Sequence, residues 1–530
     1  MKHLLFALGA LMPAVLMLAG MALSLLPGLS VLTVRRLWHV FMGLSGLASL
    51  CAVITACAGP QFPEFHPWLG ATPIGSALAL LVQLLGSVIA AFSARYLDGE
   101  PGQRRFIGAL AGVLTAVHLL LMADHWLVLI AAWALVGIVL QHLLCFYPDR
   151  PFALLAAHKK HIADRIADVL LVCAATLAWS EVQSGSLSDL WTHIGHQGMS
   201  AVLQLSAVCL VLAVILRTAL LPVHGWLIQV MEAPTPVSAL LHAGVVNLGG
   251  FVLIRFAPLL EHAMPARMLL LVFGLGTAVL AGLVMLTRIS IKVRLAWSTT
   301  AQMGFLVLEC GLGLYTLAAL HLIGHSLYKA QAFLSASMVV RQTRLHAMHH
   351  VSTPIPISLL LAPIGTIPTV LLIQSVLSQA AWPWWWSAVL GLAWAPLLWL
   401  PAQPGSLRSI CLHGGAGLLM VAGLTGAALL AHALPFGLVD APDHALGMIT
   451  LTGMAALYLL LVLLQLRPQA LRGWRRRSYA GFYLDETYTR MALQFWPARW
   501  VPRALKTSIR APNAPNAPNA PNAPAKDAPR

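Results

Sequence analysis

The stretch APTPVSALLHAGVVNLGGFVLIRFAPLL, residues 233–260, is long and apolar enough to cross a bilayer, yet it is not a simple membrane helix. Two prolines, Pro234 and Pro236, stand near its start, and His242 lies well inside it. Prolines free backbone carbonyls, and a break within lipid persists only where protein covers it or a cavity adjoins it. The stretch therefore predicts a broken transmembrane helix that carries an ionisable group.

The composition of the whole chain agrees with a membrane location. Of 530 residues, 59% are hydrophobic and 9% are charged, and the mean hydropathy is +0.82, whereas ordinary globular chains carry about 25% charge. The net charge of +15 comes from basic residues clustered in loops, so it indicates topology rather than nucleic-acid binding. The seven cysteines include no CxxC pair, so we expect neither a zinc nor an iron–sulfur site and no cofactor in this chain.

Fifteen apolar segments approach the length of about 20 residues that a bilayer crossing needs. They are residues 4–27, 37–58, 73–95, 106–123, 125–147, 162–180, 203–221, 236–259, 268–287, 294–313, 315–339, 355–380, 384–400, 409–432 and 445–466. Loops rich in Arg and Lys alternate with loops that carry acidic residues or no charge, so we expect an odd number of spans with the N-terminus periplasmic and the C-terminus cytoplasmic. The N-terminal run favours a first membrane helix over a signal peptide, because it is long and lacks a clear cleavage site.

The expected fold is an all-α polytopic membrane protein of the bacterial inner membrane, with about 15 transmembrane helices (13 to 16). We divide it into N-terminal helices (1–105), a core with an ion relay (106–345) and divergent C-terminal helices (346–466). The amphipathic segment that follows (467–510), with FYLDETYTRMALQFWPARW, is typical of an interfacial or docking helix. The remaining residues (511–530) begin with an APN repeat, which is a low-complexity tail.

Ionisable residues inside these spans are the candidate functional residues, because each is costly in lipid unless it is paired or hydrated. They are Arg165, Asp168, Arg217, His242, Lys292, Glu309, His321, His325 and Lys329. Arg165 and Asp168 are i,i+3 neighbours and could neutralise each other as a structural or a functional ion pair.

The segment HLIGHSLYK places His321, His325 and Lys329 four residues apart, on one helical face. A metal site is one interpretation, but the segment lacks the glutamate of a zincin motif and the lysine would repel a cation. Satisfied core histidines are a second. A hydrated proton path is the third and suits three aligned bases best, since histidine titrates near neutral pH and burial lowers the pKa of a lysine toward it.

Several segments resemble, in order and spacing, the antiporter-like subunits of respiratory complex I and of Mrp sodium/proton antiporters. They are DRIADVLLV (164–172), the stretch at 233–260, IKVRLAWSTTAQMGFLVL (291–308), LHLIGHSLYKAQAFLSAS (320–337) and GFYLDETY (481–488). The resemblance implies an antiporter-like fold with inverted repeats and broken helices. It also implies a proton relay of His242, Lys292, His321, His325 and Lys329. Arg165 and Asp168 match the family's ion-pair helix.

The chain departs from that family in three places. WALVG (133–137) has Ala134 where the family has a glutamate, and Arg217 stands where a lysine is usual. Arginine stays protonated, so it cannot cycle as a lysine can. Residues 355–400 contain no basic residue, so the usual exit lysine is absent. Glu309 is our candidate for the carboxylate that brings protons to the relay.

These departures point to a divergent branch, most similar to the DabB membrane subunits of DAB inorganic-carbon accumulation complexes. The resemblance implies that H⁺, or Na⁺, movement drives hydration of CO₂ to bicarbonate by a large soluble DabA-like partner at the cytoplasmic face. That partner, which resembles β-carbonic anhydrase, would hold the zinc. We expect no catalytic site in this chain. A subunit of a complex I or hydrogenase-like redox pump, an Mrp-type antiporter subunit and a non-conducting anchor are the alternatives.

Overall fold

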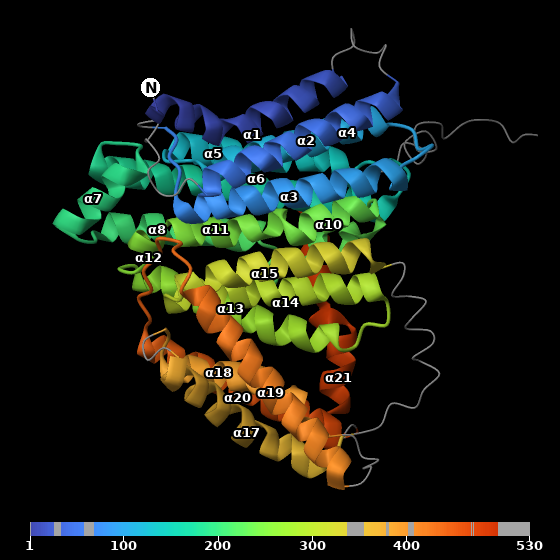
Figure 1. The fold of residues 1–530 in the computed structure, drawn as a ribbon, viewed down its shortest axis with the longest axis vertical. Helices are drawn as coiled ribbons and strands as arrows, with labels where there is room; N and C mark the ends of the chain where they lie inside the picture. Colours follow the sequence, from blue (N-terminus) through green and yellow to red (C-terminus); the bar gives the residue numbers. More distant parts are fainter. Residues whose placement is uncertain are drawn as a thin grey trace, which may run out of the picture.

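The computed structural model describes residues 2–25, 33–57, 68–336, 354–377, 381–400, 407–467, 469 and 471–496 (Figure 1). Within these ranges the chain is nearly all helical, and the only β pairings are two isolated bridges. Nine of the described helices are long and apolar enough to cross a membrane, and three shorter apolar helices accompany them. The predicted all-α polytopic membrane fold is confirmed.

Fifteen segments of the described chain correspond one by one to the predicted spans. They are α1 (Lys2–Leu25), α2 (Val34–Cys57), α3 (Pro73–Tyr96), α4 (Gln103–Leu121), α5 (Trp126–Leu144), α6 (Pro151–Val182), α8 (Ala201–Arg217) with α9 (Gly225–Gln229), α10 (Thr235–Ala243) with α11 (Leu248–Arg255), α13 (Met264–Met285), α14 (Ile291–Leu312), α15 (Tyr315–Leu334), α17 (Pro356–Leu377), α18 (Trp384–Trp394), α19 (Leu407–His432) and α20 (His444–Leu466). The shorter α7 (Leu187–Gln197), α12 (Ala257–Leu260), α21 (Arg472–Tyr479) and α22 (Leu484–Phe495) lie at their ends.

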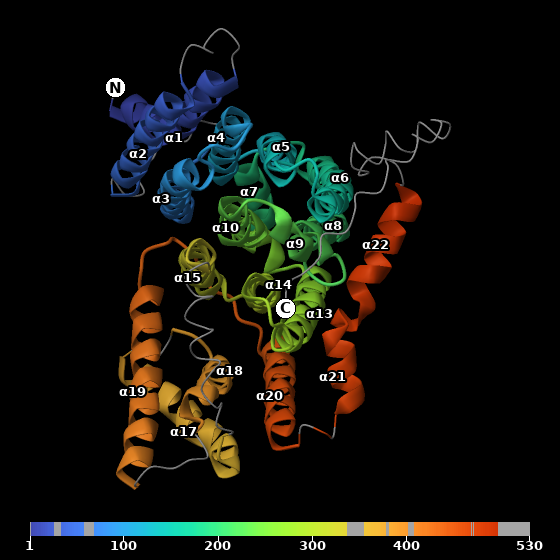
Figure 2. The same cartoon turned by 90° about the vertical axis from the view of Figure 1, so that its right-hand side faces the viewer.

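The long segments run back and forth between two faces of the molecule. We call one the α7 face, after the short helix that lies there, and the other the α22 face, where α21 and α22 lie across the ends of the bundle (Figures 1 and 2). The described chain begins at the α7 face and ends at the α22 face, as an odd number of crossings requires. The APN tail (511–524) lies outside the described residues.

The segments α1 to α15 share one large apolar core. Close helix contact depends on small residues, as it does in many membrane proteins. A methyl group added at Gly274 of α13 would lie 2.8 Å from the carbonyl oxygen of Gly304 of α14, and one at Gly304 would lie 2.6 Å from the backbone nitrogen of Ala278. These two helices therefore pack backbone to backbone. A second apolar cluster around Trp385 and Trp386 joins α18 and its neighbours to α14 and α15.

Two of the crossing segments are broken. The break predicted within residues 233–260 is present, but it begins at Gly244, whereas Pro234 and Pro236 lie at the start of α10. One break separates α8 from α9 and contains Pro222. The other separates α10 from α11, where Asn247 donates a side-chain hydrogen bond of 3.0 Å to the carbonyl of Ala243 and another of 2.7 Å to Ser326 of α15. A backbone carbonyl freed by the break thus receives a side-chain donor, and the break is tied to the neighbouring helix.

Helix α6 is longer than predicted. It begins at Pro151, so Lys159 and Lys160, which the sequence analysis assigns to a loop, are helical and buried. At 1.5 Å per residue its 32 residues span about 48 Å, which exceeds the roughly 30 Å apolar core of a bilayer. The helix is therefore longer than a crossing along the membrane normal needs, and the two lysines near its start have carboxylate partners.

Candidate ion-translocation site

The predicted site residues form two groups. The first, which we call the paired cluster, lies where α6 meets α8 and comprises Lys160, Asp164, Arg165, Asp168 and Arg217. The second, which we call the base row, lies on α10, α14 and α15 and comprises the five predicted relay residues, His242, Lys292, His321, His325 and Lys329, with Glu309 bonded to it.

Asp168 is the centre of the paired cluster. Its carboxylate accepts a hydrogen bond from the Arg217 guanidinium, and its second oxygen lies 2.9 Å from Arg165. The predicted i,i+3 contact with Arg165 is present, and Arg217 adds a partner from another helix. Only 4% of the Arg217 side chain is exposed, and its guanidinium lies 4.7 Å from the centre of the Trp133 ring. A buried guanidinium needs such a carboxylate and aromatic surround.

A second acid–base pair, which the sequence analysis missed, lies one turn away on α6. Lys160 donates a hydrogen bond to Asp164, and both side chains are buried. Gly137 of α5 faces this pair, because a methyl group there would lie 2.7 Å from the Asp164 carboxylate. The i,i+4 spacing of Lys160 and Asp164 was the available signal, but the loop assignment of the lysine concealed it.

Arg217 has an acid partner although position 134 is alanine. In the described residues the acid that faces Arg217 is Asp168 of α6, and α5 supplies none.

Lys329 is the central lysine of the base row. Its side chain is fully buried, and its ammonium nitrogen donates to the backbone oxygen of Leu295 at 3.1 Å and to the hydroxyl of Ser298 at 2.7 Å. No carboxylate among the described residues lies within ion-pair distance of it. Neutral oxygens accept from a charged or a neutral amine alike, so this lysine is not held in its charged form by an acid.

Two buried imidazoles lie next to Lys329, within electrostatic range of its ammonium group: His242 and His325. Both ring nitrogens of each are buried without a hydrogen-bond partner among the described residues. His242 stacks on Phe333 with ring centres 4.5 Å apart. Buried polar atoms are nearly always hydrogen-bonded, so these four unpaired nitrogens disfavour the reading as satisfied core histidines.

Glu309 lies at the end of the base row toward the α7 face. Its carboxylate is 2.8 Å from Nδ1 of His321, whose ring lies 6.1 Å from that of His325. The sequence places Glu309 twelve residues before His321, on another helix, so its contact with the histidine could not be read from spacing. Glu309 thus contacts His321, one of the predicted relay residues.

The other end of the base row reaches the α22 face through hydroxyl groups. Lys292 donates to the Thr235 hydroxyl at 2.9 Å, and Thr235 donates to the hydroxyl of Tyr96 at 3.4 Å. Tyr96 is exposed and lines an open groove of about 1240 Å³ between α2 and α3. These hydrogen bonds therefore link Lys292, one of the predicted relay residues, to the surface at this face.

Near the α7 face, the sequence analysis missed Asp440 and His432. Asp440 accepts a hydrogen bond from the backbone of Thr316 at 2.8 Å, and its other oxygen lies 3.2 Å from His432. Both Asp440 and Glu309 lie within electrostatic range of Cys310. Within the described ranges, no three His, Cys, Asp or Glu side chains are grouped as metal ligands.

Comparison with known proteins follows the same division of the chain. The family model described as NADH:quinone oxidoreductase/Mrp antiporter, transmembrane, matches residues 123–370, which contain both the paired cluster and the base row. The probable inorganic carbon transporter subunit DabB of Hydrogenovibrio crunogenus is 37% identical over 459 residues, which cover 84% of this chain and 86% of that protein. The NADH-quinone oxidoreductase subunit L of Mycobacterium tuberculosis is 34% identical over 280 residues, covering 52% of this chain and 43% of that one.

A solved structure has the same fold. The Mrp complex from a Dietzia species matches with a TM-score of 0.59 at 22% sequence identity, over 99% of this chain and 64% of that chain. The chain thus spans about two thirds of the Mrp subunit's length. The predicted antiporter-like fold is confirmed.

Proposed function

The chain belongs to the family of NADH:quinone oxidoreductase and Mrp antiporter membrane subunits, and we propose that it translocates protons to drive inorganic-carbon accumulation by a soluble partner. Similarity to DabB proteins over most of the chain supports a transport subunit in carbon uptake, and the antiporter-family domain supports cation translocation. The proton is the cation we propose, because the membrane-embedded groups are bases.

The observation that carries this proposal is the base row. Its buried Lys329 bonds neutral oxygens, and its neighbours His242 and His325 have unpaired nitrogens. Lysine and imidazole can each gain and lose a proton when they are not locked to an acid. Protons then pass between Glu309 and His321 at one end and Lys292, Thr235 and Tyr96 at the other.

The paired cluster has a different role in this mechanism. Arg217 stays charged and cannot carry protons itself. Asp168 contacts both Arg165 and Arg217, so a change in the strength of either contact changes the field at the start of the relay. We propose that the cluster sets this field while the base row conducts.

We place the protein in a bacterial inner membrane with the α22 face in the cytoplasm. Residues near this face include Arg35, Arg36, Arg95, Arg104, Arg105, Arg150, Arg472, Arg475, Arg476 and Arg477. Acidic residues near the α7 face include Asp124, Glu181, Asp189, Glu261, Asp440 and Asp443. Arg255, a basic residue at the same face, forms an ion pair with Asp124. Basic residues favour the cytoplasmic side of a membrane.

The partner we propose is a large soluble DabA-like protein that holds zinc and hydrates CO₂ at the cytoplasmic face. The chain itself would then be a transporter subunit without a catalytic centre. Helices α21 and α22 lie on the face where such a partner would dock (Figure 2).

The test is growth in air of a carbonic-anhydrase-deficient bacterium that expresses this chain with its partner. We expect the wild type to restore growth, and a protonophore to abolish the rescue. Lys329→Ala and His325→Ala should each abolish it at normal membrane levels of the protein. His262→Ala is the matched control, because His262 lies exposed near the α7 face. Full rescue by both relay variants would refute the proposal.

A further inference from the structure

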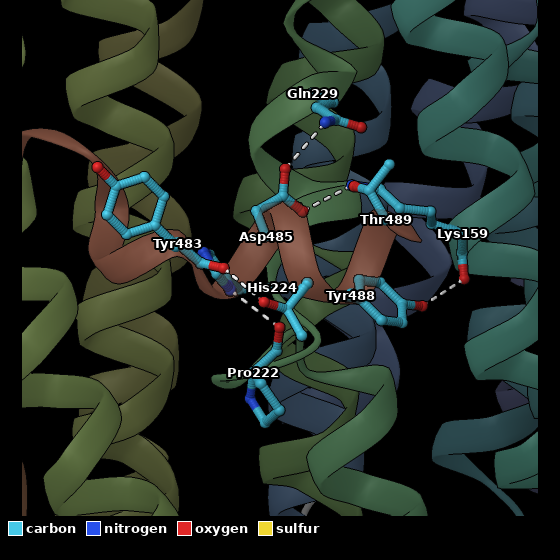
Figure 3. Close-up of polar contacts among 9 residues, drawn as sticks. Lys159, Pro222, His224, Gln229, Tyr483, Asp485, Tyr488 and Thr489 are labelled. Atoms are coloured by element: carbon cyan, nitrogen blue, oxygen red, sulfur yellow. Dashed lines mark hydrogen bonds and ion pairs between the residues drawn. The ribbon is translucent and has the colours of Figure 1, made fainter. Parts of the chain in front are cut away.

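Helix α22 inserts a carboxylate into the α22 face of the membrane bundle (Figure 3). Asp485, in the first turn of α22, bonds two helices of the bundle at once. One carboxylate oxygen lies 2.6 Å from the ammonium nitrogen of Lys159 on α6, and the other accepts a hydrogen bond of 2.9 Å from Gln229 on α9. The contact joins residues 326 positions apart in the sequence.

Lys159 is enclosed by α22. Its side chain is fully buried, and it also donates to the Thr489 hydroxyl at 2.9 Å. Tyr488 donates from its hydroxyl to the backbone oxygen of Lys159 at 2.8 Å, and its ring lies 5.5 Å from the lysine nitrogen. Asp485 is more exposed than Lys159, because 25% of its side chain is accessible. The carboxylate thus contacts both a buried lysine and the exterior of the protein.

The bundle is shaped to receive this carboxylate. Gly225, at the start of α9, faces it so closely that an added methyl group would lie 1.4 Å from an Asp485 oxygen and 2.8 Å from the Lys159 nitrogen. Any other residue at position 225 would therefore displace the Asp485 carboxylate from this position.

The backbone turn just before Asp485 places α22 against the bundle. Phe482 and Tyr483 have left-handed backbone angles, with φ of 56° and 57°, and turn the chain from α21 into α22. Non-glycine residues adopt such angles infrequently. Phe482 and Leu484 pack against the apolar cluster around Trp297 of α14, which anchors the turn.

The inserted carboxylate lies beside the paired cluster. Lys160, the residue after Lys159, belongs to that cluster and bonds Asp164. Tyr488 is in reach of both acids: burial raises the pKa of its hydroxyl, and the charges of Asp164 and Asp485 raise it further. The α22 contact and the paired cluster therefore form one electrostatic unit.

We propose that Asp485 exchanges protons between Lys159 and water at the α22 face, and that this exchange sets the charge beside the paired cluster. In the exchange step the proton of the Lys159 ammonium moves along the hydrogen bond to Asp485, which leaves an amine and a carboxylic acid. The acid releases this proton to water on its exposed side, which leaves a neutral amine beside a carboxylate and so one net negative charge next to the cluster. Uptake is the reverse sequence. This inference rests on the proposed proton translocation.

The experiment measures proton flux per assembled complex in proteoliposomes, and its dependence on pH at the α22 face, for the full chain with its partner. Asp485→Asn should lower the flux about ten-fold and flatten its pH dependence. This loss is smaller than the roughly 10²–10⁴-fold typical of a group that transfers a proton in a catalytic step, because the base row remains intact. Asp485→Glu should retain most of the flux.

Two matched variants separate proton exchange from docking. Asp149→Asn removes the same charge from an exposed residue near the same face, and Thr489→Val removes another contact of Lys159 without touching a carboxylate. Asp149→Asn should conduct like the wild type, and Thr489→Val should keep the wild-type pH dependence and lose less than about two-fold in flux, since one hydrogen bond is lost and Asp485 stays in place. Wild-type flux and pH dependence in Asp485→Asn would overturn the inference, and so would equal losses in Asp485→Asn and Thr489→Val.

A different variant tests the proposed proton translocation independently of Asp485. If Lys329→Arg conducts like the wild type, the relay itself is wrong. If Lys329→Arg loses flux while Asp485→Asn does not, only the role of Asp485 is refuted.

Discussion

The paired cluster and the base row solve the same problem, which is how to keep ionisable groups inside a membrane protein, in opposite ways. In the paired cluster each buried acid contacts a base, as Asp168 contacts Arg217 and Asp164 contacts Lys160. In the base row Lys329 contacts only neutral oxygens among the described residues, and His242 and His325 have no hydrogen-bond partner there. Pairing with an opposite charge favours the charged form of a buried group, and its absence leaves a base free to titrate. The first arrangement suits a fixed field and the second suits proton conduction.

The largest expected effect is on assembly, from breaking a pair. Asp168→Asn leaves the Arg217 guanidinium buried without its full acid partner, which costs about 3–5 kcal/mol for a buried pair. We expect most of the complex to be lost from the membrane fraction, measured by gel filtration in detergent.

The double variant Asp168→Asn/Arg217→Met should recover complex, because it removes both charges together. Asp149→Asn, at an exposed carboxylate near the same face, is the control. Normal assembly of Asp168→Asn alone would contradict the structural role given to the paired cluster, since the ion pair would then contribute nothing to the fold.

The next effect is on transport, at the acidic end of the base row. Glu309→Gln removes the carboxylate that lies 2.8 Å from His321 while retaining a hydrogen-bonding side chain of similar size. We expect normal assembly and a carbon-uptake rate reduced several-fold, measured with labelled bicarbonate. Glu261→Gln, in the loop near the same face, should leave the rate unchanged. Equal rates in both variants would remove Glu309 from the path.

A rescue experiment sharpens the account of position 134. Trp133 contacts Arg217, and Gly137 faces Asp164, so Ala134 lies on the part of α5 that borders the paired cluster. We expect Ala134→Glu to restore part of the complex lost in Asp168→Asn, because it returns a carboxylate from α5. Assembly levels identical with and without the added glutamate would show that a carboxylate on α5 cannot replace Asp168 as the partner of Arg217.

The smallest effect is expected at the α22 contact. Tyr488→Phe loses one neutral hydrogen bond to the Lys159 backbone, which is worth about 1 kcal/mol. We expect transport to fall by less than about two-fold and the thermal stability of the complex to fall slightly. Tyr483→Phe, at an exposed tyrosine in the preceding turn, is the comparison variant. A loss as large as that in Asp485→Asn would indicate that docking alone controls flux.

Much of the fold could be predicted from the sequence because a bilayer imposes length and apolarity on every crossing. The predicted span at 445–466, for example, corresponds to α20 at His444–Leu466. The paired cluster could be predicted only where spacing along one helix revealed it, as for Arg165 and Asp168. The contacts of Asp168 with Arg217, Glu309 with His321 and Asp485 with Lys159 join different helices. They depend on packing, which local spacing does not encode.

The buried lysines at the start of α6 are the second feature that the sequence did not predict. Lys159 and Lys160 resemble loop residues in the sequence because a lysine pair is costly in lipid. The acids that neutralise them lie one turn later and 326 residues later, and only the second of these is beyond the reach of sequence reasoning.

The central claim is that Lys329 gives up and regains a proton while the chain conducts. The direct test is proton flux into proteoliposomes that contain the complex, followed with an internal pH dye, for the wild type and Lys329→Arg. Arginine keeps the charge and the hydrogen-bonding capacity, but it does not release its proton. Our account predicts normal assembly of Lys329→Arg and proton flux reduced to the level of empty vesicles. Wild-type flux in this variant would contradict it.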